Sequence, residues 1–273
     1  MPDVIRTRFR DDLRDHGPKG RFYMWKGEGP FISVTNALQN GVPKPALMRW
    51  SAKMVAEYVA QNWDEAAELR AQMDTVEFTS LLKNKPWRAR DKAADIGSLV
   101  HDLAEHYALY GEVTSELPDD PVAEKKIVQV VDFFDTVKPR VWAVEGVVYN
   151  RQFGYAGAFD LIAEVPGVDG LSIIDLKTGS GVYAEAALQQ TAYRHGEFIA
   201  VGDEEVPMPA TSGAFCLHIG ENGWKLVPVV TDDSSWFAFR AALHIAKWVT
   251  GEGDGSEKAA VQPAIMSGRA DYE

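Results

Sequence analysis

In the first half of the chain, apolar residues recur at intervals of three and four, the spacing of amphipathic helices. One such stripe follows a helix-start signal at Pro43 and Pro45 and consists of Leu47, Trp50, Met54 and Tyr58. A second helical stretch covers residues 64–82. The clearest stripe consists of Ile96, Val100, Leu103, Tyr107 and Tyr110. It predicts a helix over residues 90–110, and a further helix is predicted over residues 120–137.

After residue 140 the pattern changes to short runs of β-branched and aromatic residues, separated by breaks that contain glycine. Strands are predicted over residues 141–149, 155–165 and 171–178, with a hairpin turn joining the last two. The remaining predicted elements are a helix at 183–199, strands at 211–219 and 224–230, and a helix at 234–250. Residues 1–30 lack clear periodicity, and residues 31–35 fit either a short strand or the entry into a helix.

This order of elements, with no internal repeat, predicts an α/β fold in which helices flank a central mixed sheet. The helices before the first strand predict an additional N-terminal helical lobe. We therefore divide the chain into an N-terminal helical region (1–89), a core (90–250) and a flexible, glycine-rich tail (251–273).

The composition is that of a globular protein, with 46% hydrophobic and 25% charged residues in 273. We expect a cytoplasmic protein without membrane contact, since no apolar run approaches the roughly 20 residues of a membrane span and the N-terminus does not resemble a secretory signal. Cys216 is the only cysteine, which excludes an internal disulfide and any metal cluster held by cysteines alone.

The net charge of −12 argues at first against a polyanionic partner, but the charge is unevenly distributed. One basic stretch contains Lys83, Lys85, Arg88, Arg90 and Lys92, with Asp91 as its only acidic residue. A second basic stretch runs from Arg6 to Lys26. Each stretch fits either a solvated helix face or a surface that contacts a polyanion.

The strongest chemical signal is an acidic pair with a lysine in two apolar runs. Asp175 and Lys177 are two residues apart on a predicted strand, so their side chains point to the same face. Asp160, on the neighbouring strand, can bring a second carboxylate to them. Two carboxylates bind a hard divalent cation, and an adjacent ammonium can orient a water or stabilise charge at phosphorus. A surface Asp-x-Lys ion pair is the alternative, but the apolar neighbours Ile173 and Ile174 predict a buried strand.

Four further residues are candidates for the same site. His101 lies beside the apolar stripe of its helix, where it can face a cleft or belong to the core. Glu145 is a charge within an apolar strand, either facing solvent or joining the acidic pair. Gln189 and Tyr193 share a helix face, where they can contact a phosphate, anchor the lysine strand or lie at the edge of the core.

In chain order these signals are a helical histidine, an acidic strand position, Gly-x-x-Asp, Asp-x-Lys and Gln-x-x-x-Tyr. This order resembles the RecB-like branch of the PD-(D/E)XK nuclease superfamily, whose core is restriction-endonuclease-like. Residues 32–35 and 43–47 also resemble bacteriophage exonuclease-type members, more loosely. Each motif is unspecific alone, and five in order are much more specific. Many relatives hold an iron–sulfur cluster with four cysteines, which this chain cannot form.

The resemblance implies roles for these residues. Asp160 and Asp175 would bind Mg²⁺ or Mn²⁺, with the Leu176 carbonyl and His101 completing the site. Lys177 would position or activate the attacking water. The remaining catalytic candidates, supporting the site or contacting DNA, are Gln189, Tyr193 and, less firmly matched, Glu145.

The resulting expectation is a metal-dependent DNA nuclease, more specifically an exonuclease, acting in recombination, repair or phage DNA processing in a bacterial or phage-infected cell. The residues expected to contact DNA are Lys83, Lys85, Trp87, Arg88, Arg90 and Lys92. A helicase or a single-strand-binding or annealing protein is a candidate partner. The alternatives are a catalytically silent DNA-binding accessory of the same fold and a hydrolase of small phosphoesters.

Overall fold

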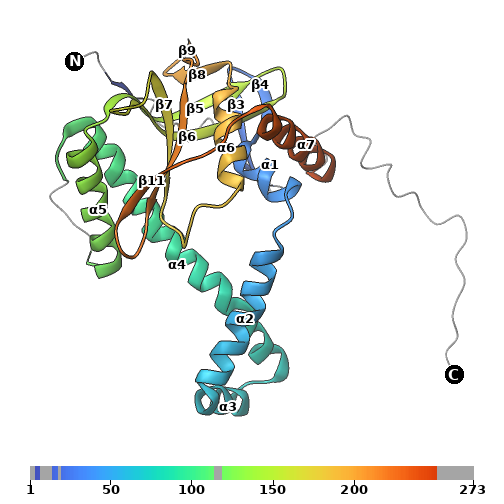
Figure 1. Cartoon of the computed structure of the whole chain (residues 1–273). Helices are drawn as coiled ribbons and strands as arrows, with labels where there is room; N and C mark the ends of the chain where they lie inside the picture. The colour runs from blue at the N-terminus through green and yellow to red at the C-terminus, as the bar shows by residue number, and fades with distance from the viewer. Residues whose placement is uncertain (1–3, 7–13, 18–19, 114–118, 251–273) are drawn as a thin grey trace, which may run out of the picture.

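The computed structural model describes residues 4–6, 14–17, 20–113 and 119–250 (Figure 1). Its centre is a mixed sheet of 11 strands. The strands are β1 (Ile5–Arg6), β2 (Arg14–Gly17), β3 (Gly20–Trp25), β4 (Glu28–Ser33), β5 (Arg140–Asn150), β6 (Tyr155–Glu164), β7 (Leu171–Lys177), β8 (Phe198–Val201), β9 (Glu204–Pro207), β10 (Gly213–Ile219) and β11 (Trp224–Pro228). The helices are α1 (Val34–Gly41), α2 (Pro45–Gln61), α3 (Trp63–Gln72), α4 (Thr75–Tyr110), α5 (Pro121–Val137), α6 (Glu185–Arg194) and α7 (Asp233–Thr250).

Strand β6 has two different neighbours along one of its edges. β5 pairs antiparallel with nearly the whole of β6. On the other edge, β4 pairs with Tyr155 and Ala156, whereas β7 pairs only from Leu161 onward. No strand pairing is found on that edge between Ala156 and Leu161 among the described residues. The sheet therefore splits beside Asp160.

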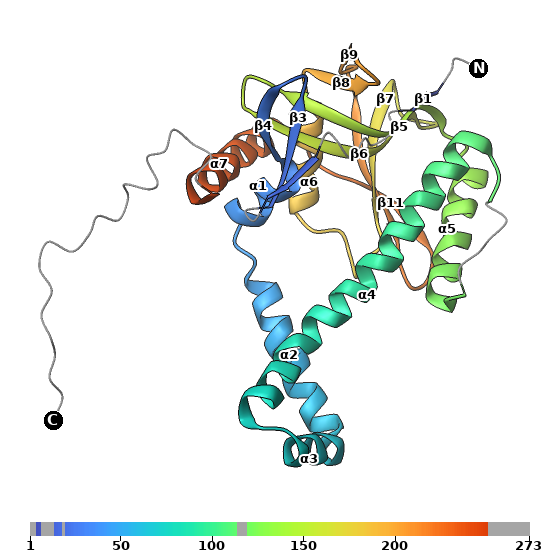
Figure 2. The ribbon, with the colours of Figure 1, turned by 180° about the vertical axis from the view of Figure 1, so that it is seen from behind.

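Helices cover both faces of this sheet (Figure 2). α4 and α5 pack on one face, where Val100 and Phe133 join a cluster that contains Leu161 of β6. α1, α6 and α7 pack on the other, where Tyr193 and Phe239 join Ile162. The alternation of Leu161 and Ile162 between the two clusters is the two-residue period of a strand buried on both faces.

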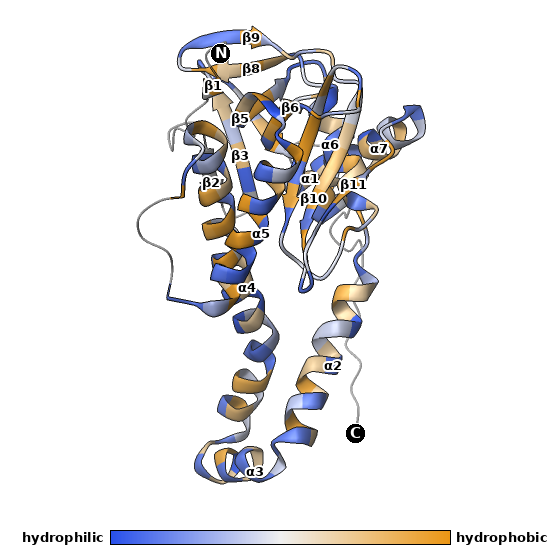
Figure 3. Cartoon of the chain, turned by 60° about the vertical axis from the view of Figure 1, so that its left-hand side comes forward, coloured by the Kyte–Doolittle hydropathy of each residue, from blue (hydrophilic) through white to orange (hydrophobic). Residues whose placement is uncertain are grey.

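Below the sheet, α2, α3 and the first part of α4 project away from the core as an arm (Figures 1 and 3). Helix α2 has no buried residue, unlike every helix of the core. Two reciprocal hydrogen bonds fix the turn between α3 and α4. The Asp74 side chain accepts from the backbone N–H of Glu77, and the Glu77 side chain accepts from the backbone N–H of Asp74. This reciprocal capping box begins a new helix, so the helix predicted over 64–82 is two helices.

The predicted α/β architecture with a mixed sheet flanked by helices is confirmed. The strands and the hairpin predicted between residues 141 and 178 are present, as are those at 211–219 and 224–230 and the helices at 120–137 and 234–250. Residues 31–35 contain both of the expected alternatives, the end of a strand and the entry into a helix, because β4 is followed directly by α1.

Three further predictions of local structure are wrong. Residues 20–33, for which at most a short strand was expected, form β3 and β4 of the central sheet. The helix predicted over 183–199 ends at Arg194, and Phe198–Val201 is strand β8, paired with β5. The helix predicted over 90–110 begins at Thr75, so the boundary between residues 89 and 90 falls within α4. The predicted tail at 251–273 lies outside the described residues.

Two further predictions concern cysteine and membranes. Cys216 is free and buried on β10. Within the described ranges, none of the helices combines the length and the apolar character needed to cross a bilayer.

Candidate active site

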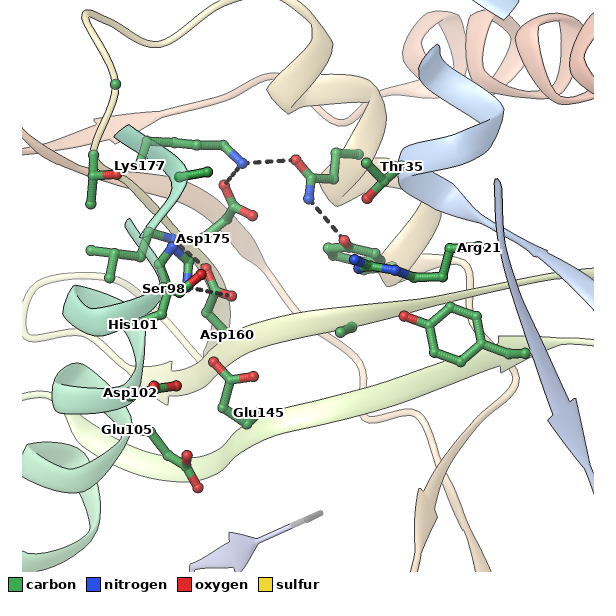
Figure 4. A pocket seen from close by; sticks show the side chains of 18 residues that line it. Arg21, Thr35, Ser98, His101, Asp102, Glu105, Glu145, Asp160, Asp175 and Lys177 are labelled. Atoms are coloured by element: carbon green, nitrogen blue, oxygen red, sulfur yellow. Dashed lines mark hydrogen bonds and ion pairs between the residues drawn. The ribbon is translucent and has the colours of Figure 1, made fainter. Parts of the chain in front are cut away.

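The split in the sheet opens into a pocket of about 980 Å³. Its walls come from β3, α1, α4, β5, β6, β7 and α6, so seven elements contribute to one cavity. Figure 4 shows that the acidic side chains gather at the α4 side, whereas Arg21 and Thr35 lie at the opposite side. The pocket thus has an acidic end and an end that carries a cationic side chain.

Asp160 is the centre of the acidic end. Its Oδ2 accepts from the backbone N–H of Leu176 at 2.6 Å, and its Oδ1 lies 3.3 Å from Nδ1 of His101. The β6–β7 ladder ends at the Leu161–Ile174 pair, so the Asp160 side chain takes the place of a backbone acceptor for Leu176. This bond fixes the carboxylate at the point where the strands diverge.

Glu145 stands opposite Asp160 on the neighbouring strand. The flanking pairs Val144–Leu161 and Gly146–Phe159 set this register, and the Glu145 backbone has a φ of 48°, in the left-handed region. Opposite positions on paired strands bring side chains into contact. Ligand atoms of His101, Glu145 and Asp160 all lie within 4.8 Å of one another. Glu145 therefore joins the acidic cluster and does not simply face solvent.

Asp175 and Lys177 project into the pocket together, as their spacing predicts. The Lys177 ammonium lies 2.6 Å from Asp175 Oδ2 and donates to Gln189 Oε1 at 2.9 Å. The Gln189 amide in turn donates to the Tyr193 hydroxyl at 2.8 Å. Gln189, supported by Tyr193, thus anchors the lysine, one of the roles predicted for this helix face.

Gly157 allows α6 to approach β6 this closely. A Cβ at this position would lie 2.5 Å from Cε1 of Tyr193 and 2.9 Å from Cγ2 of Val34. Real Cβ contacts are not that short, so the glycine of the Gly-x-x-Asp signal is required by the packing of Tyr193 on the strand.

Burial and mutual repulsion perturb the titration of these groups. Burial lowers the pKa of His101, but the surrounding carboxylates, Asp160 foremost, raise it to about 9. Burial raises the pKa of Glu145 to about 8, with a further contribution from Asp160. Burial also raises the pKa of Asp175 to about 6, against the opposing effect of Lys177. Protons on these groups therefore compensate the negative charge of the cluster, and a bound cation would compensate the same charge.

The two remaining groups keep their charges. Burial disfavours the charged form of Asp160, but His101 and Lys177 outweigh it and its pKa is lowered. Burial disfavours the ammonium of Lys177 as well, but Asp175 outweighs it and the lysine pKa is raised. At neutral pH, Lys177 is therefore a cation beside an acidic cluster.

Helix α5 holds the chain that follows Lys177. The Lys126 ammonium donates to the carbonyl oxygens of Thr178 and Ile219 at 2.9 and 3.0 Å. His218 Nε2 lies 2.9 Å from the Gly179 carbonyl oxygen. Thr178 and Gly179 both line the pocket, so these bonds fix the wall next to the lysine.

The predicted DNA-contacting residues all lie on α4, on the stretch leading from the arm to the pocket. Lys83, Trp87 and Arg90 are spaced by four and three from one another and continue in helical register to Ala94, which lines the pocket. Lys85 and Lys92 face elsewhere, Lys85 over the Tyr58 ring at 3.5 Å and Lys92 3.9 Å from Asp120. The Arg90 guanidinium lies over the Trp87 ring at 4.4 Å.

Several pocket residues were not predicted. Glu105 follows His101 by four on the same helix, a spacing that could have indicated it, whereas Asp102 follows His101 by one. Among the others are Arg21, Tyr23, Thr35 and Ser98. Arg21 and Tyr23 lie on β3, which the sequence pattern did not reveal.

No protein-family model matches this chain, and a comparison with curated proteins finds no significant relative. The functional assignment therefore rests on the residues of the pocket.

Proposed function

We propose that this chain is a DNA nuclease that depends on Mg²⁺ or Mn²⁺, has a core of the PD-(D/E)XK type and acts as an exonuclease. The observation that supports this most is the convergence of Asp160, Asp175 and Lys177 in one pocket, beside a histidine and a further glutamate. Two carboxylates and a lysine with perturbed pKa values, gathered in a cavity, are a typical signature of a catalytic site.

The donor atoms fit a hard divalent cation. His101 Nδ1 and carboxylate oxygens of Glu145 and Asp160 are close enough to share one ion. Oxygen donors with one imidazole suit Mg²⁺ and Mn²⁺, while Cys216, the only cysteine, cannot hold an iron–sulfur cluster alone. Asp175 is the donor predicted for the same ion, and in the described structure its Oδ2 is paired with Lys177. A bound cation would polarise a phosphoryl oxygen and lower the pKa of a water molecule.

The side chains of the chain itself supply orientation and charge. The Leu176 N–H holds the Asp160 carboxylate in place. The Lys177 ammonium, fixed between Asp175 and Gln189, would orient the attacking water and stabilise the negative charge that develops on the phosphate. Because Asp175 raises its pKa, Lys177 would act as a cation in these roles.

A polymeric substrate is supported by the basic face of α4. Lys83 and Arg90 lie on the helix face that continues into the pocket, where they would contact successive phosphates of one strand. The expected role in recombination, repair or phage DNA processing remains part of the proposal. So do the cytoplasmic location and a partner that is a helicase or a single-strand-binding or annealing protein.

The test compares end-labelled linear DNA with a closed circle in Mg²⁺, Mn²⁺ or EDTA. Asp175→Asn, which keeps the shape of the side chain and removes its charge, is the control. Metal-dependent loss of the linear DNA alone, absent in the variant, is the expected result. Cutting of the circle would replace the exonuclease with an endonuclease.

Two other outcomes would reject a nuclease. Binding of DNA without cleavage under any metal would support a catalytically silent accessory. Hydrolysis of p-nitrophenyl phosphate without any action on DNA would support a hydrolase of small phosphoesters.

A further inference from the structure

The arm, defined as α2, α3 and residues 75–92 of α4, contributes no side chain to the pocket itself. α2 contributes no buried side chain, and its first turns expose Leu47, Met48 and Trp50 at 43%, 71% and 38%. In the core, by contrast, helices bury their apolar faces against the sheet. The arm is therefore held together mainly by its own helices and presents its surface to a partner or to solvent.

The two long helices of the arm lead to opposite walls of the pocket. They meet where Lys85 of α4 lies over the Tyr58 ring of α2, and from there they diverge towards the core (Figures 1 and 3). α4 continues to Ala94 and His101 on the acidic wall. α2 is preceded by α1, whose Thr35 lines the other wall. The diverging halves thus flank the approach to the site.

Charge is segregated along the arm. Residues 44–53 and 83–92, which include the diverging half of α2 and a basic length of α4, contain eight basic residues and one acidic residue. Residues 54–82, which include α3 at the far end, contain six acidic residues and one basic residue. This distribution favours a polyanion beside the half of the arm nearest the core and disfavours one at its tip.

Each basic segment also carries an exposed tryptophan. Trp50 lies between Arg49 and Lys53 on α2, and Trp87 is 48% exposed beneath the Arg90 guanidinium. Isolated exposed tryptophans need no explanation. These two, however, lie one on each helix and each among cations, which is the combination that binds unpaired bases by stacking while neutralising the backbone.

We propose that the basic halves of α2 and α4 form a clamp for single-stranded DNA, with Trp50 and Trp87 as its stacking platforms. This inference rests on the proposed function, since it assigns the form of DNA that the pocket receives. Bases in a duplex are already stacked and paired, so exposed indoles add affinity only for a strand whose bases are free. The clamp would lead the end of that strand along the α4 face to the acidic end of the pocket.

Trp63 provides a matched control. It is the same residue type, is 67% exposed and begins α3 in the acidic segment, directly before Asp64 and Glu65. Loss of an exposed indole there has the same consequence for solubility and fluorescence, without removing a platform of the proposed clamp.

The test measures binding of a fluorescent 20-nucleotide oligo(dT), and of a labelled 20-base-pair duplex, by anisotropy in EDTA. From about 1–3 kcal/mol per stacked base, Trp50→Ala and Trp87→Ala should each weaken binding of the single strand by about 5- to 150-fold. Trp50→Phe should restore most of the affinity, and Trp63→Ala should change it less than about twofold. Affinity for the duplex should be nearly unchanged in all variants.

The clamp is refuted if Trp50→Ala and Trp87→Ala bind the single strand as the wild type does, or if Trp63→Ala loses as much affinity. Equal losses for single strand and duplex would also overturn it, because they would show a general effect on charge or folding. Since EDTA prevents metal-dependent cleavage, this result is independent of turnover. If the protein binds single strands specifically but does not cleave DNA in Mg²⁺, the clamp is retained and the nuclease is refuted. If it cleaves DNA in Mg²⁺ but the tryptophan variants bind single strands as the wild type does, the nuclease is retained and the clamp is refuted.

Discussion

Replacing Glu145 with glutamine tests whether bound protons compensate the negative charge of the acidic cluster when metal is removed with EDTA. In the folded, metal-free protein the pKa of Glu145 is about 8 and that of His101 about 9, against ordinary values of 4.5 and 6.5. The raised pKa of His101 stabilises the fold below pH 6.5, and this contribution is lost as the pH rises through 9. For Glu145, a carboxyl whose folded pKa is raised, ionisation destabilises the fold as the pH rises from 4.5 to 8.

Both effects have the same sign between pH 6.5 and 8, because the folded state then holds more protons than the unfolded chain. With up to two extra protons and about 1.36 kcal/mol per proton and pH unit, the free energy of unfolding should fall by at most about 2.7 kcal/mol per pH unit. In Glu145→Gln one of these protons is absent, so the slope should be at most about 1.4 kcal/mol per pH unit.

The assay is urea unfolding followed by tryptophan fluorescence at several pH values between 6.5 and 8, in EDTA and in saturating Mg²⁺. In Mg²⁺ the wild-type slope should shrink, since the cation replaces the protons. A wild-type stability that stays level or rises over this range in EDTA would refute the reasoning. So would a Glu145→Gln slope equal to that of the wild type.

Three further predictions concern single side chains. Lys177→Met should lower the rate of DNA cleavage by about 100- to 1,000-fold at unchanged substrate affinity, measured as single-turnover kinetics. Gly157→Ala should lower the free energy of unfolding by about 1–3 kcal/mol, measured in urea, because the new Cβ would overlap the Tyr193 ring, 2.5 Å away. Lys126→Met should slow cleavage and destabilise the protein by about 1–3 kcal/mol, because the half-buried carbonyl of Thr178 loses its donor. Lys126→Arg should retain part of the cleavage rate and of the stability.

The central strands and the convergence of the acidic pair with the lysine could be predicted because they depend on local patterns. Residues 155–165 and 171–178 are apolar runs joined by a short turn, so their pairing follows from the chain itself. The two-residue spacing of Asp175 and Lys177 then decides their common direction. Glu145 was less certain, because its place opposite Asp160 depends on the register between β5 and β6.

The N-terminal strands could not be predicted, because their residues do not alternate between apolar and polar. In β3, Phe22 and Tyr23 are adjacent, and both are buried, in different clusters. A strand that is buried on both faces lacks the alternation that identifies a strand from sequence. Arg21 was missed for the same reason, although it lines the pocket.

The end of α6 was missed because only residues 195–197 separate the helix from strand β8. The sequence from Ala192 to Val201 contains only one glycine, Gly196, and its apolar residues fit both periods. Contacts with distant parts of the chain determine where the helix ends. Phe198–Val201 pairs with β5, and a Cβ at Gly196 would lie 1.9 Å from the Val148 side chain. Long-range pairing overrides local helix propensity here.

The split beside Asp160 links the fold to the proposed chemistry. A backbone N–H at the point where strand pairing ends needs an acceptor. For the N–H of Leu176 this acceptor is the side-chain carboxylate of Asp160. The same carboxylate lies against His101 and opposite Glu145, so the strand divergence that opens the pocket also holds the charge in it. Like charges on opposite positions of paired strands are destabilising unless something compensates them. In the metal-free protein that compensation comes from protons on His101 and Glu145, and a divalent cation at this point would supply it with greater charge and release those protons.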